Sequence, residues 1–349
     1  MGFRSLKRHL AARLLAAVMI SLFISPVTRA AIYPHTQGTV GELLQYKVRE
    51  NESLIEIARR FDLGYNSIVD ANPGVDPFLP RPGTMVTIPT YWIVPAATIR
   101  PNIIINLPEY RLYYFSKKPT GTVATFPLGI GDEGTDTPLG SYTVIEKITS
   151  PSWHVPGSMR RQGKRLPKVV PPGPGNPLGS HALRLSRGSI LIHGTNRPWG
   201  IGRRSSHGCL RLYPEDIVPL FGMTQTGMRV LIINQPLKIG SKGDKVLVEV
   251  HRNEGEEPTV GEAMHLLFKS NLLFKTDFSK LVQAFAEKKG VPVDVTLAHL
   301  PSNGPLESLL LLQRTFLPEY PENLLFISGK LNAFLLHAPL NLLHVFPRG

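Results

Sequence analysis

A single cysteine, Cys209, lies in the stretch RRSSHGCLRL at residues 203–212. Taken by itself, a lone cysteine is more often a small buried apolar residue than a catalytic group. Its surroundings favour chemistry: His193 ends the apolar stretch SILIH, a glycine-rich connection follows, and Arg211 comes shortly after the cysteine. Because the thiolate is the reactive form and an ordinary thiol is mostly protonated at neutral pH, a nucleophilic cysteine needs such a base or positive charge. These residues predict a cysteine nucleophile that His193, the nearby His207 or the local arginines activate.

Gly208, directly before the cysteine, adds a second element of the same chemistry. A residue without a side chain lets backbone N–H groups point at an incoming carbonyl oxygen, and this is how an oxyanion hole forms. Pro214 suits the first turn of a helix that follows the site. The stretch therefore predicts attack on a carbonyl group with stabilisation of the resulting oxyanion.

A metal site is the main chemical alternative, since His193, His207 and Cys209 are all zinc-type ligands. However, His207 and Cys209 are close neighbours in the chain, there is no second cysteine, and no fourth ligand is evident nearby. The sequence therefore predicts neither a metal nor another cofactor.

The segment that would position this chemistry, residues 99–234, consists of short apolar runs separated by glycine and proline. Strands of this length and spacing are typical of a β-sandwich or a closed sheet. Residues 155–180, rich in proline, glycine and basic side chains, predict a long surface loop. The expected strands are 103–106, 110–115, 122–127, 141–148, 182–185, 190–193 and 228–233.

Residues 45–89 have a different pattern. Ser53 and Glu56 offer a capping box, and the apolar residues that follow recur at helical spacing. A second short helix is expected from Asn66 and is stopped by residues 72–74. Alternating apolar residues at both ends predict short strands, so the whole segment is expected to be a small βααβ module.

The remaining segments define the organisation of the chain. Residues 1–30 combine a basic start, a short apolar run and a small-residue cleavage site, which predict a signal peptide and export. Residues 31–44 are expected to be a linker, and residues 236–300 an extension with a hairpin and helices. The leucine-rich tail, residues 301–349, has no assignment. No transmembrane helix is expected in the mature chain, because no later apolar run approaches membrane-spanning length.

Basic residues outnumber acidic ones, 39 against 26, which gives a formal net charge of +13. Such an excess favours anionic surroundings, such as nucleic acid, a membrane surface or an acidic wall polymer. The sequence holds no nucleic-acid-binding motif, and export argues against that partner. The charge leaves a membrane surface and an acidic wall polymer open as partners.

Two short motifs, His-Gly-Thr at 193–195 and Ser-His-Gly-Cys-Leu-Arg at 206–211, together resemble the signature of the L,D-transpeptidase catalytic domain, the YkuD family. The stretches TPLGSY at 137–142 and NPLGSHALRL at 176–185 extend the resemblance over residues 99–234. It implies a mainly β catalytic domain with a sandwich-like fold.

The module at residues 45–89, with YKVRENESLIEIARRF, IVDANP and PGTMVTIP, resembles a LysM domain. That family binds the N-acetylglucosamine backbone of peptidoglycan and chitin. Its binding groove would bring in Glu50, Asn51 and Asn72. The expected fold is thus a mainly β catalytic domain, a small βααβ LysM domain and a C-terminal α/β extension.

The L,D-transpeptidase resemblance also implies a role for each site residue. Cys209 is the nucleophile, His193 is its base, and the backbone carbonyl of Gly194 orients the imidazole. The amides of Gly208 and Cys209 form the oxyanion hole, and His207 supports their loop. Contacts with the substrate are expected from Arg211, Thr195, Trp199 and Ser206.

Several of these substrate contacts have a structural alternative. The hydroxyls of Thr195 and Ser206 are more readily interpreted as structural hydrogen-bonding groups. Trp199 could equally be a packing residue of its loop. Arg211 either positions the loop or meets a substrate carboxylate.

The reaction implied by the resemblance is acyl transfer on the tetrapeptide stems of peptidoglycan. Cys209 would form a thioester with release of D-alanine, and an amine would then resolve it. A stem amine gives a 3→3 cross-link, a protein lysine anchors a protein such as a lipoprotein to the wall, and water gives an L,D-carboxypeptidase. A non-catalytic peptidoglycan-binding protein is the remaining alternative. An exported enzyme of cell-wall organisation and cell shape is expected in the periplasm.

Overall fold

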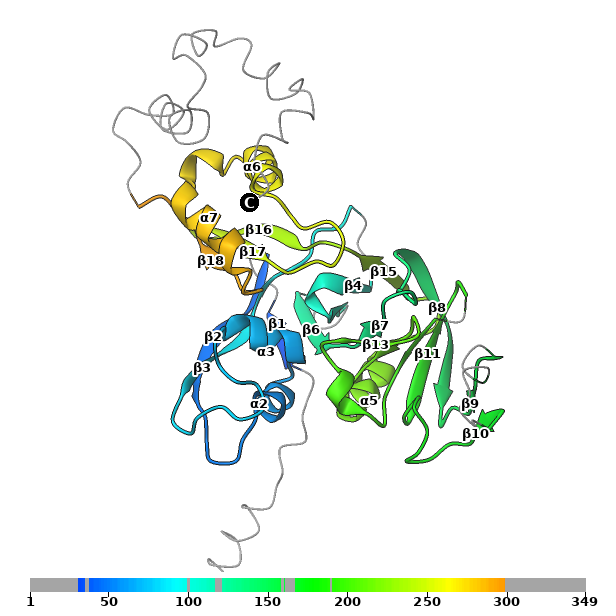
Figure 1. The fold of residues 1–349 in the computed structure, drawn as a ribbon. Coiled ribbons are helices and arrows are strands. Elements are labelled where there is room, and N and C mark those ends of the chain that lie inside the picture. Colours follow the sequence, from blue (N-terminus) through cyan, green and yellow to red (C-terminus); the bar gives the residue numbers. More distant parts are fainter. Residues whose placement is uncertain are drawn as a thin grey trace, which may run out of the picture. The chain divides into compact units, whose positions relative to one another are not determined.

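The computed structural model describes residues 31–34, 38–98, 101–116, 121–157, 160, 167–188 and 190–298, which form two compact units (Figure 1). The first unit contains 31–34, Gln45–Ile88 and Thr98–Asn234, and the second contains 38–44, Pro89–Ala97 and the residues from Gln235. The predicted signal peptide and the unassigned tail lie outside the described residues. No helix among the described residues has the length and apolar character needed to cross a membrane.

A nine-stranded mixed sheet forms the framework of the first unit. The expected strands are all present, with bounds shifted by no more than one residue. The order across the sheet is β1 (Ala31–Pro34), β6 (Thr122–Pro127), β5 (Arg111–Phe115), β4 (Ile103–Asn106), β15 (Arg229–Ile233), β8 (Gly140–Thr149), β11 (His181–Leu185), β12 (Leu191–His193) and β14 (Leu210–Arg211). Short 3-10 turns lie at Leu107–Glu109 and Pro198–Gly200.

The sheet curls back on itself. Gly129, just after β6, exchanges two main-chain hydrogen bonds of 2.8 and 2.9 Å with Arg211 of β14. Two short strands, β7 (Ile130–Gly131) and β13 (Arg204–Ser206), pair beside this bridge. Because β6 and β14 are far apart in the strand order, this contact bends one end of the sheet towards the other and agrees with the expected closed, mainly β fold.

Apolar side chains on one face of the strands form the core of the sheet. Leu183 of β11, Ile192 of β12 and Leu210 of β14 are fully buried there. Helix α5 (Pro214–Met223) adds Ile217 and begins at the expected proline. Full burial of each such side chain contributes about 1.5–3 kcal/mol, so this core stabilises the strands that carry the site.

Two of the loop predictions were wrong. Residues 31–44 are not a linker throughout, because β1 pairs with β6 and the next strand begins at Thr39. The segment 155–180 is not entirely irregular, since β9 (Trp153–His154) pairs with β10 (Val169–Val170). The buried Asn176 side chain donates to the carbonyls of Pro151, Val170 and Pro171, and these local hydrogen bonds order the end of the segment in a way that composition does not reveal.

The predicted βααβ module is present as β2 (Thr39–Lys47), α2 (Leu54–Arg60), α3 (Tyr65–Ala71) and β3 (Met85–Ile93), with β2 paired to β3. The capping box at Ser53 is formed, because its side chain and that of Glu56 each bond the other residue's backbone N–H. Asn72 is buried and ties the module together: its amide donates to Ile68 and Thr87 carbonyls, and its oxygen accepts from the Thr87 N–H.

The second unit is a three-stranded sheet with helices packed on it. The predicted hairpin is β16 (Leu237–Lys242) and β17 (Lys245–Val250), and β18 (Val293–Asp294) joins it. The helical segment is divided into α6 (Val260–Lys269), a short 3-10 turn (Leu273–Lys275) and α7 (Phe278–Glu287). Lys288 takes the left-handed position at the end of α7.

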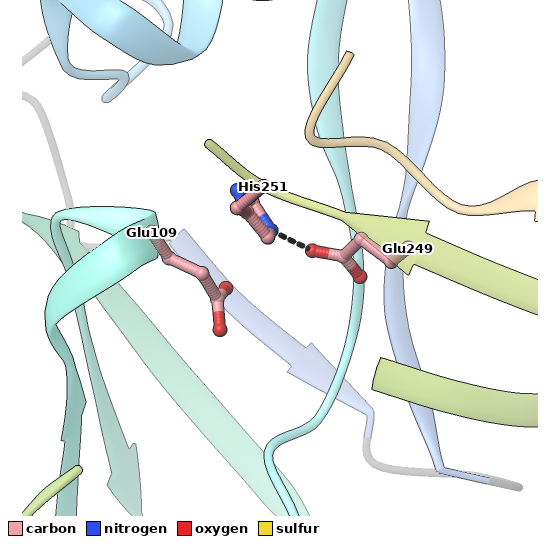
Figure 2. A group of neighbouring side chains, drawn as sticks. All are labelled: Glu109, Glu249 and His251. Atoms are coloured by element: carbon pink, nitrogen blue, oxygen red, sulfur yellow. Dashed lines mark hydrogen bonds and ion pairs between the residues drawn. The ribbon is translucent and has the colours of Figure 1, made fainter. Parts of the chain in front are cut away.

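A buried ionic cluster lies in the second unit (Figure 2). Lys238 Nζ lies 2.8 Å, and His251 Nε2 2.7 Å, from the same carboxylate oxygen of Glu249, whose side chain is fully buried. The other oxygen accepts from the Ile93 N–H at 2.6 Å. Burial by itself would raise the pKa of Glu249, but Lys238 and His251 hold it below its ordinary value. Glu109, also drawn in Figure 2, belongs to the first unit, where Asn106 and Tyr113 donate to it.

We expect Lys238→Met to lower the free energy of unfolding by about 3 kcal/mol, because removing one partner leaves a buried charge uncompensated. Lys245→Met, which removes the solvent-exposed ion pair with Asp294, is the matched control and should change stability little. Urea denaturation followed by circular dichroism measures both. Equal effects of the two substitutions would contradict the stabilising role of the buried cluster.

Candidate active site

The register of the sheet puts the predicted base on one strand and the predicted nucleophile at the start of the neighbouring strand. Strand β12 runs parallel to β14, with Ile192 opposite Leu210 and His193 opposite Arg211. Ile192 and Leu210 point into the core, so His193 and Arg211 lie on the other face. Cys209 directly precedes β14, and its thiol accepts a hydrogen bond from the main chain of Leu191, the first residue of the strand that carries His193.

The imidazole of His193 is held in one orientation. It is buried, and its Nδ1 lies 2.6 Å from the carbonyl oxygen of Gly194. Because a carbonyl only accepts, Nδ1 carries the proton and Nε2 keeps the lone pair of a base. A side chain at Gly194 would bring its Cβ within 3.1 Å of Ile217, so a small residue suits this position.

Burial shifts the pKa values of both His193 and Cys209. It lowers the pKa of His193 to about 4, with Arg211 acting in the same direction, although hydrogen bonds to Gly194 and Leu178 oppose the shift. Burial also raises the pKa of Cys209, and the Leu191 hydrogen bond and the charges of Arg211 and Arg184 only partly offset it. Both shifts favour a proton on the sulfur and a lone pair on the imidazole at neutral pH.

The loop before Cys209 is held by hydrogen bonds from a distant segment. Thr137 accepts from the Gly131 N–H at 3.0 Å and donates to the Gly208 carbonyl at 3.2 Å. Thr135 donates to the Ser206 carbonyl at 3.2 Å. These threonines were not predicted as site residues, although the motif TPLGSY begins at Thr137. The motif TPLGSY therefore has a structural role, because its first residue holds the loop before Cys209.

Gly208 has a backbone conformation that favours glycine, with φ of +92°. The buried Ser206 hydroxyl donates to the Cys209 carbonyl and closes the turn around it. Together these features fix the main chain that would point N–H groups at an oxyanion.

The structure separates the other predicted residues into internal and exposed groups. Thr195 is buried, and its hydroxyl accepts from the Arg197 N–H at 3.0 Å. His207 is exposed, and Trp199 is 65% exposed. Within the described part of the chain, the buried Nε of Arg211 has no hydrogen-bond partner. A guanidinium N–H forms its strongest hydrogen bonds with carboxylates and phosphates.

Arg184 is a second basic residue of the site that sequence reasoning missed. It lies opposite Leu191 of β12 on one side and opposite Glu146 of β8 on the other, with a 2.6 Å ion pair to Glu146. The positive charge of Arg184 acts to lower the pKa of Cys209. The motif NPLGSHALRL contains Arg184, but only the strand register shows that this residue lies opposite Leu191.

A cavity of about 310 Å³ lies beside the loop that follows His193. Thr195, Asn196, Asn176, Ser180 and Pro214 contribute to its uncharged lining, and Cys209 does not. It therefore adjoins the candidate site rather than containing it. Among the described residues, the ligand atoms of His193, His207 and Cys209 do not gather at one point as a zinc site requires.

Comparisons with known proteins agree on two regions of the chain. The sequence profile of the L,D-transpeptidase catalytic domain (YkuD) matches residues 100–232, and that of the LysM domain matches residues 46–89. The probable L,D-transpeptidase YcfS of Escherichia coli is 40% identical over 284 residues, covering 75% of this chain and 86% of that protein. The probable L,D-transpeptidase YbiS of the same organism is 41% identical over 249 residues, covering 68% and 80%.

Among solved structures, the catalytic domain of an Enterococcus faecium L,D-transpeptidase is similar over 39% of this chain and all of that chain, with 22% identity and a TM-score of 0.31. L,D-transpeptidase 3 of Mycobacterium tuberculosis covers 43% of this chain and 67% of that chain, with 16% identity and a TM-score of 0.29.

The raised pKa of Cys209 leads to a test of the resting charge state. We expect the rate of alkylation by iodoacetamide to keep rising through pH 9, with no step between pH 5 and 7. Because the chain has one cysteine, the mass of the intact protein reports this site alone. A plateau reached below pH 7 would instead indicate a preformed thiolate–imidazolium pair.

Proposed function

The chain belongs to the L,D-transpeptidase family, and on that premise we propose that Cys209 is the nucleophile of a transpeptidase acting on peptidoglycan stem peptides. The observation that supports this most directly is the buried His193. Its Nδ1 donates to the Gly194 carbonyl, and its strand, β12, pairs with β14, the strand that Cys209 directly precedes. Such a pairing gives the thiol a base in a fixed orientation.

In the first half-reaction, Nε2 of His193 accepts the thiol proton while Sγ of Cys209 attacks a carbonyl carbon. This carbonyl joins the L-centre of meso-diaminopimelate to the terminal D-alanine. The amides of Gly208 and Cys209 donate to the oxyanion. The C–N bond then breaks, His193 returns the proton to the leaving amine, and D-alanine departs from a thioester. Removing a single oxyanion-hole donor typically lowers kcat by about 10²–10³-fold, which indicates what this loop contributes.

In the second half-reaction an amine attacks the thioester and gives its proton to His193. A new amide bond forms, and the Cys209 thiol is restored. A diaminopimelate amine of another stem yields a 3→3 cross-link, and a lysine of a protein such as a lipoprotein yields anchoring to the wall. One observation suits this order of events: burial lowers the pKa of His193 to about 4 and raises that of Cys209, which favours a proton on sulfur and a lone pair on the imidazole before attack.

The basic residues of the site suit an anionic substrate. Arg211, with its unpaired Nε, binds a stem carboxylate, and Arg184 adds positive charge on the same side of the thiol. The exposed Trp199 contacts the acceptor strand. Thr195 and Ser206 use their hydroxyls inside their own loops and act as positioning residues. His207 contributes to the loop from its exposed side.

The LysM domain holds the enzyme on the glycan of its own substrate, which raises the local concentration of stems. Of the groove residues suggested by the family, Asn72 is used inside the module, so Glu50 and Asn51 are the better candidates for glycan contact. Glycan attachment, the predicted export signal and the basic chain suit an enzyme of the periplasm that organises the wall and maintains cell shape.

Incubation with a carbapenem, an acylating β-lactam, tests the nucleophile. We expect the intact wild-type protein to gain the mass of one inhibitor molecule, Cys209→Ala to gain none, and His193→Ala to react about 10²–10⁴-fold more slowly because it lacks the base. His265→Ala, which removes an exposed imidazole of α6 in the second unit, is the matched control and should be acylated at close to the wild-type rate. A wild-type protein that stays unmodified would overturn the proposal and favour a non-catalytic wall-binding protein.

The acceptor is identified by the products formed from purified tetrapeptide-containing stem fragments. We expect an amide-linked dimer with release of D-alanine, measured by mass spectrometry, and no reaction with Cys209→Ala. Tripeptide without dimer, even when a lysine-containing peptide is added, would identify water as the acceptor and hence a carboxypeptidase.

A further inference from the structure

The first turn of helix α3 in the LysM domain is completed by the catalytic domain. The first N–H groups of a helix have no acceptor within it, and Gly64, at the start of α3, offers no side-chain cap. The Tyr65 N–H instead donates to the Ile201 carbonyl at 3.1 Å, and the Asn66 N–H to the Gly202 carbonyl at 3.2 Å. These carbonyls belong to the loop that leads to Cys209.

Two glycines make this contact possible. A Cβ at Gly64 would lie 2.5 Å from Cα of Gly202, and a Cβ at Gly202 would lie 2.2 Å from the nitrogen of Tyr65. Real Cβ atoms do not approach so closely, so neither chain could carry a side chain here without moving. Both glycines are buried. We call this contact, Gly64–Asn66 against Ile201–Gly202, the glycine joint.

Side chains close the glycine joint on both sides. Arg59 of α2 binds both carboxylate oxygens of Glu215 of α5, at 2.6 and 2.9 Å. The Arg203 guanidinium lies 3.4 Å from the centre of the Tyr65 ring. The buried Tyr213 donates to the Leu63 carbonyl at 3.1 Å. Bidentate and stacked arginine contacts fix geometry as well as adding energy.

The interior behind the joint is also polar and well connected. Arg111 of β5, fully buried, donates to the Asp62 carbonyl at 3.3 Å. Asp216 of α5 is buried and hydrogen-bonded to Asp62, and burial together with the Asp62 and Glu215 charges raises the pKa of Asp216 well above its ordinary value. Buried polar groups of this kind favour one relative placement of the two domains.

A short continuous path runs from the joint to the nucleophile. The Gly202 N–H donates to the Leu128 carbonyl at 3.1 Å, and the Arg203 carbonyl accepts from the Ile130 N–H at 3.1 Å. Strand β13, residues Arg204–Ser206, then pairs with β7 and ends at Ser206, whose hydroxyl donates to the Cys209 carbonyl. A displacement of Ile201–Gly202 would therefore be passed directly to the turn at Gly208.

We propose that the LysM domain positions the nucleophile: the glycine joint holds the loop from Ile201 to Cys209 in the geometry that acyl transfer requires. The inference rests on the proposed role of Cys209. Gly64 and Gly202 are positioning residues that never touch the substrate. The LysM domain thus has a second task besides binding glycan, and it contributes to the rate even on a substrate that contains no sugar. A misplacement of about 1 Å is enough to lower a rate by roughly 10²-fold.

Gly64→Ala tests the joint without disturbing the module itself. The φ of Gly64 is −84°, which suits any residue, so the added methyl conflicts only with Gly202. We expect the second-order rate constant for acylation by a carbapenem, which has no glycan, to fall at least tenfold. Hydrogen exchange of the amides from Ile201 to Ser206, measured by mass spectrometry, should become faster. Binding to purified glycan strands should stay at the wild-type level.

Gly222→Ala is the matched control, because Gly222 is exposed on α5 and a Cβ there meets no atom within 4 Å. It should keep the wild-type rate and the wild-type exchange. Arg59→Gln adds no bulk and removes the two hydrogen bonds to the Glu215 carboxylate. We expect this substitution to lower the acylation rate severalfold while the protein remains folded.

The outcomes separate this inference from the proposed function. A Gly64→Ala protein that is folded and acylates at the wild-type rate would overturn the positioning role. If Gly64→Ala fails to fold, Arg59→Gln decides, and a wild-type rate there would have the same meaning. If the wild-type protein itself takes up no carbapenem, the proposed function fails, and the exchange measurement still reports whether the joint holds the loop.

Discussion

The parallel pairing of β12 with β14 sets the geometry of the candidate site. It places His193 opposite Arg211, on the strand next to the one that Cys209 precedes. Side chains alternate along a strand, so a slip of one residue would send His193 into the core and Ile192 to the site. The buried apolar residues between the sheet and α5 prevent such a slip. The same strand register therefore sets both which apolar residues enter the core and where His193 lies.

Burial then shifts the pKa values of His193 and Cys209. A thiol and an imidazole that were open to water beside two arginines would favour the thiolate. Here desolvation outweighs those charges, lowering the pKa of His193 and raising that of Cys209. Both shifts disfavour the thiolate, and reactivity towards oxidants follows the thiolate fraction. The charges of Arg211 and Arg184 act on the pKa of Cys209 in the opposite direction.

The loop of the nucleophile is supported from opposite directions. On one side Thr135 and Thr137 bond its carbonyls, and on the other the glycine joint ties Gly202 to the start of α3. Both supports act on the main chain, which is the part that would form the oxyanion hole. A wall-binding module that merely tethered the enzyme would need none of these contacts. Their number and burial favour a module that is built into the catalytic unit.

The sequence by itself determined most of the elements and the family. Apolar runs separated by glycine and proline located the strands of the main sheet, Ser53 with Glu56 located a helix start, and the motifs around His193 and Cys209 indicated the family, because all of these depend on residues close together in the chain. Only the tertiary structure decided that burial raises the pKa of the thiol, that Arg184 lies opposite Leu191, and that Thr137 holds the loop. Only the structure, too, singled out Gly64 and Gly202 among 31 glycines. Their importance arises from contact between segments far apart in the sequence, and no local pattern of side chains records where two backbones will meet.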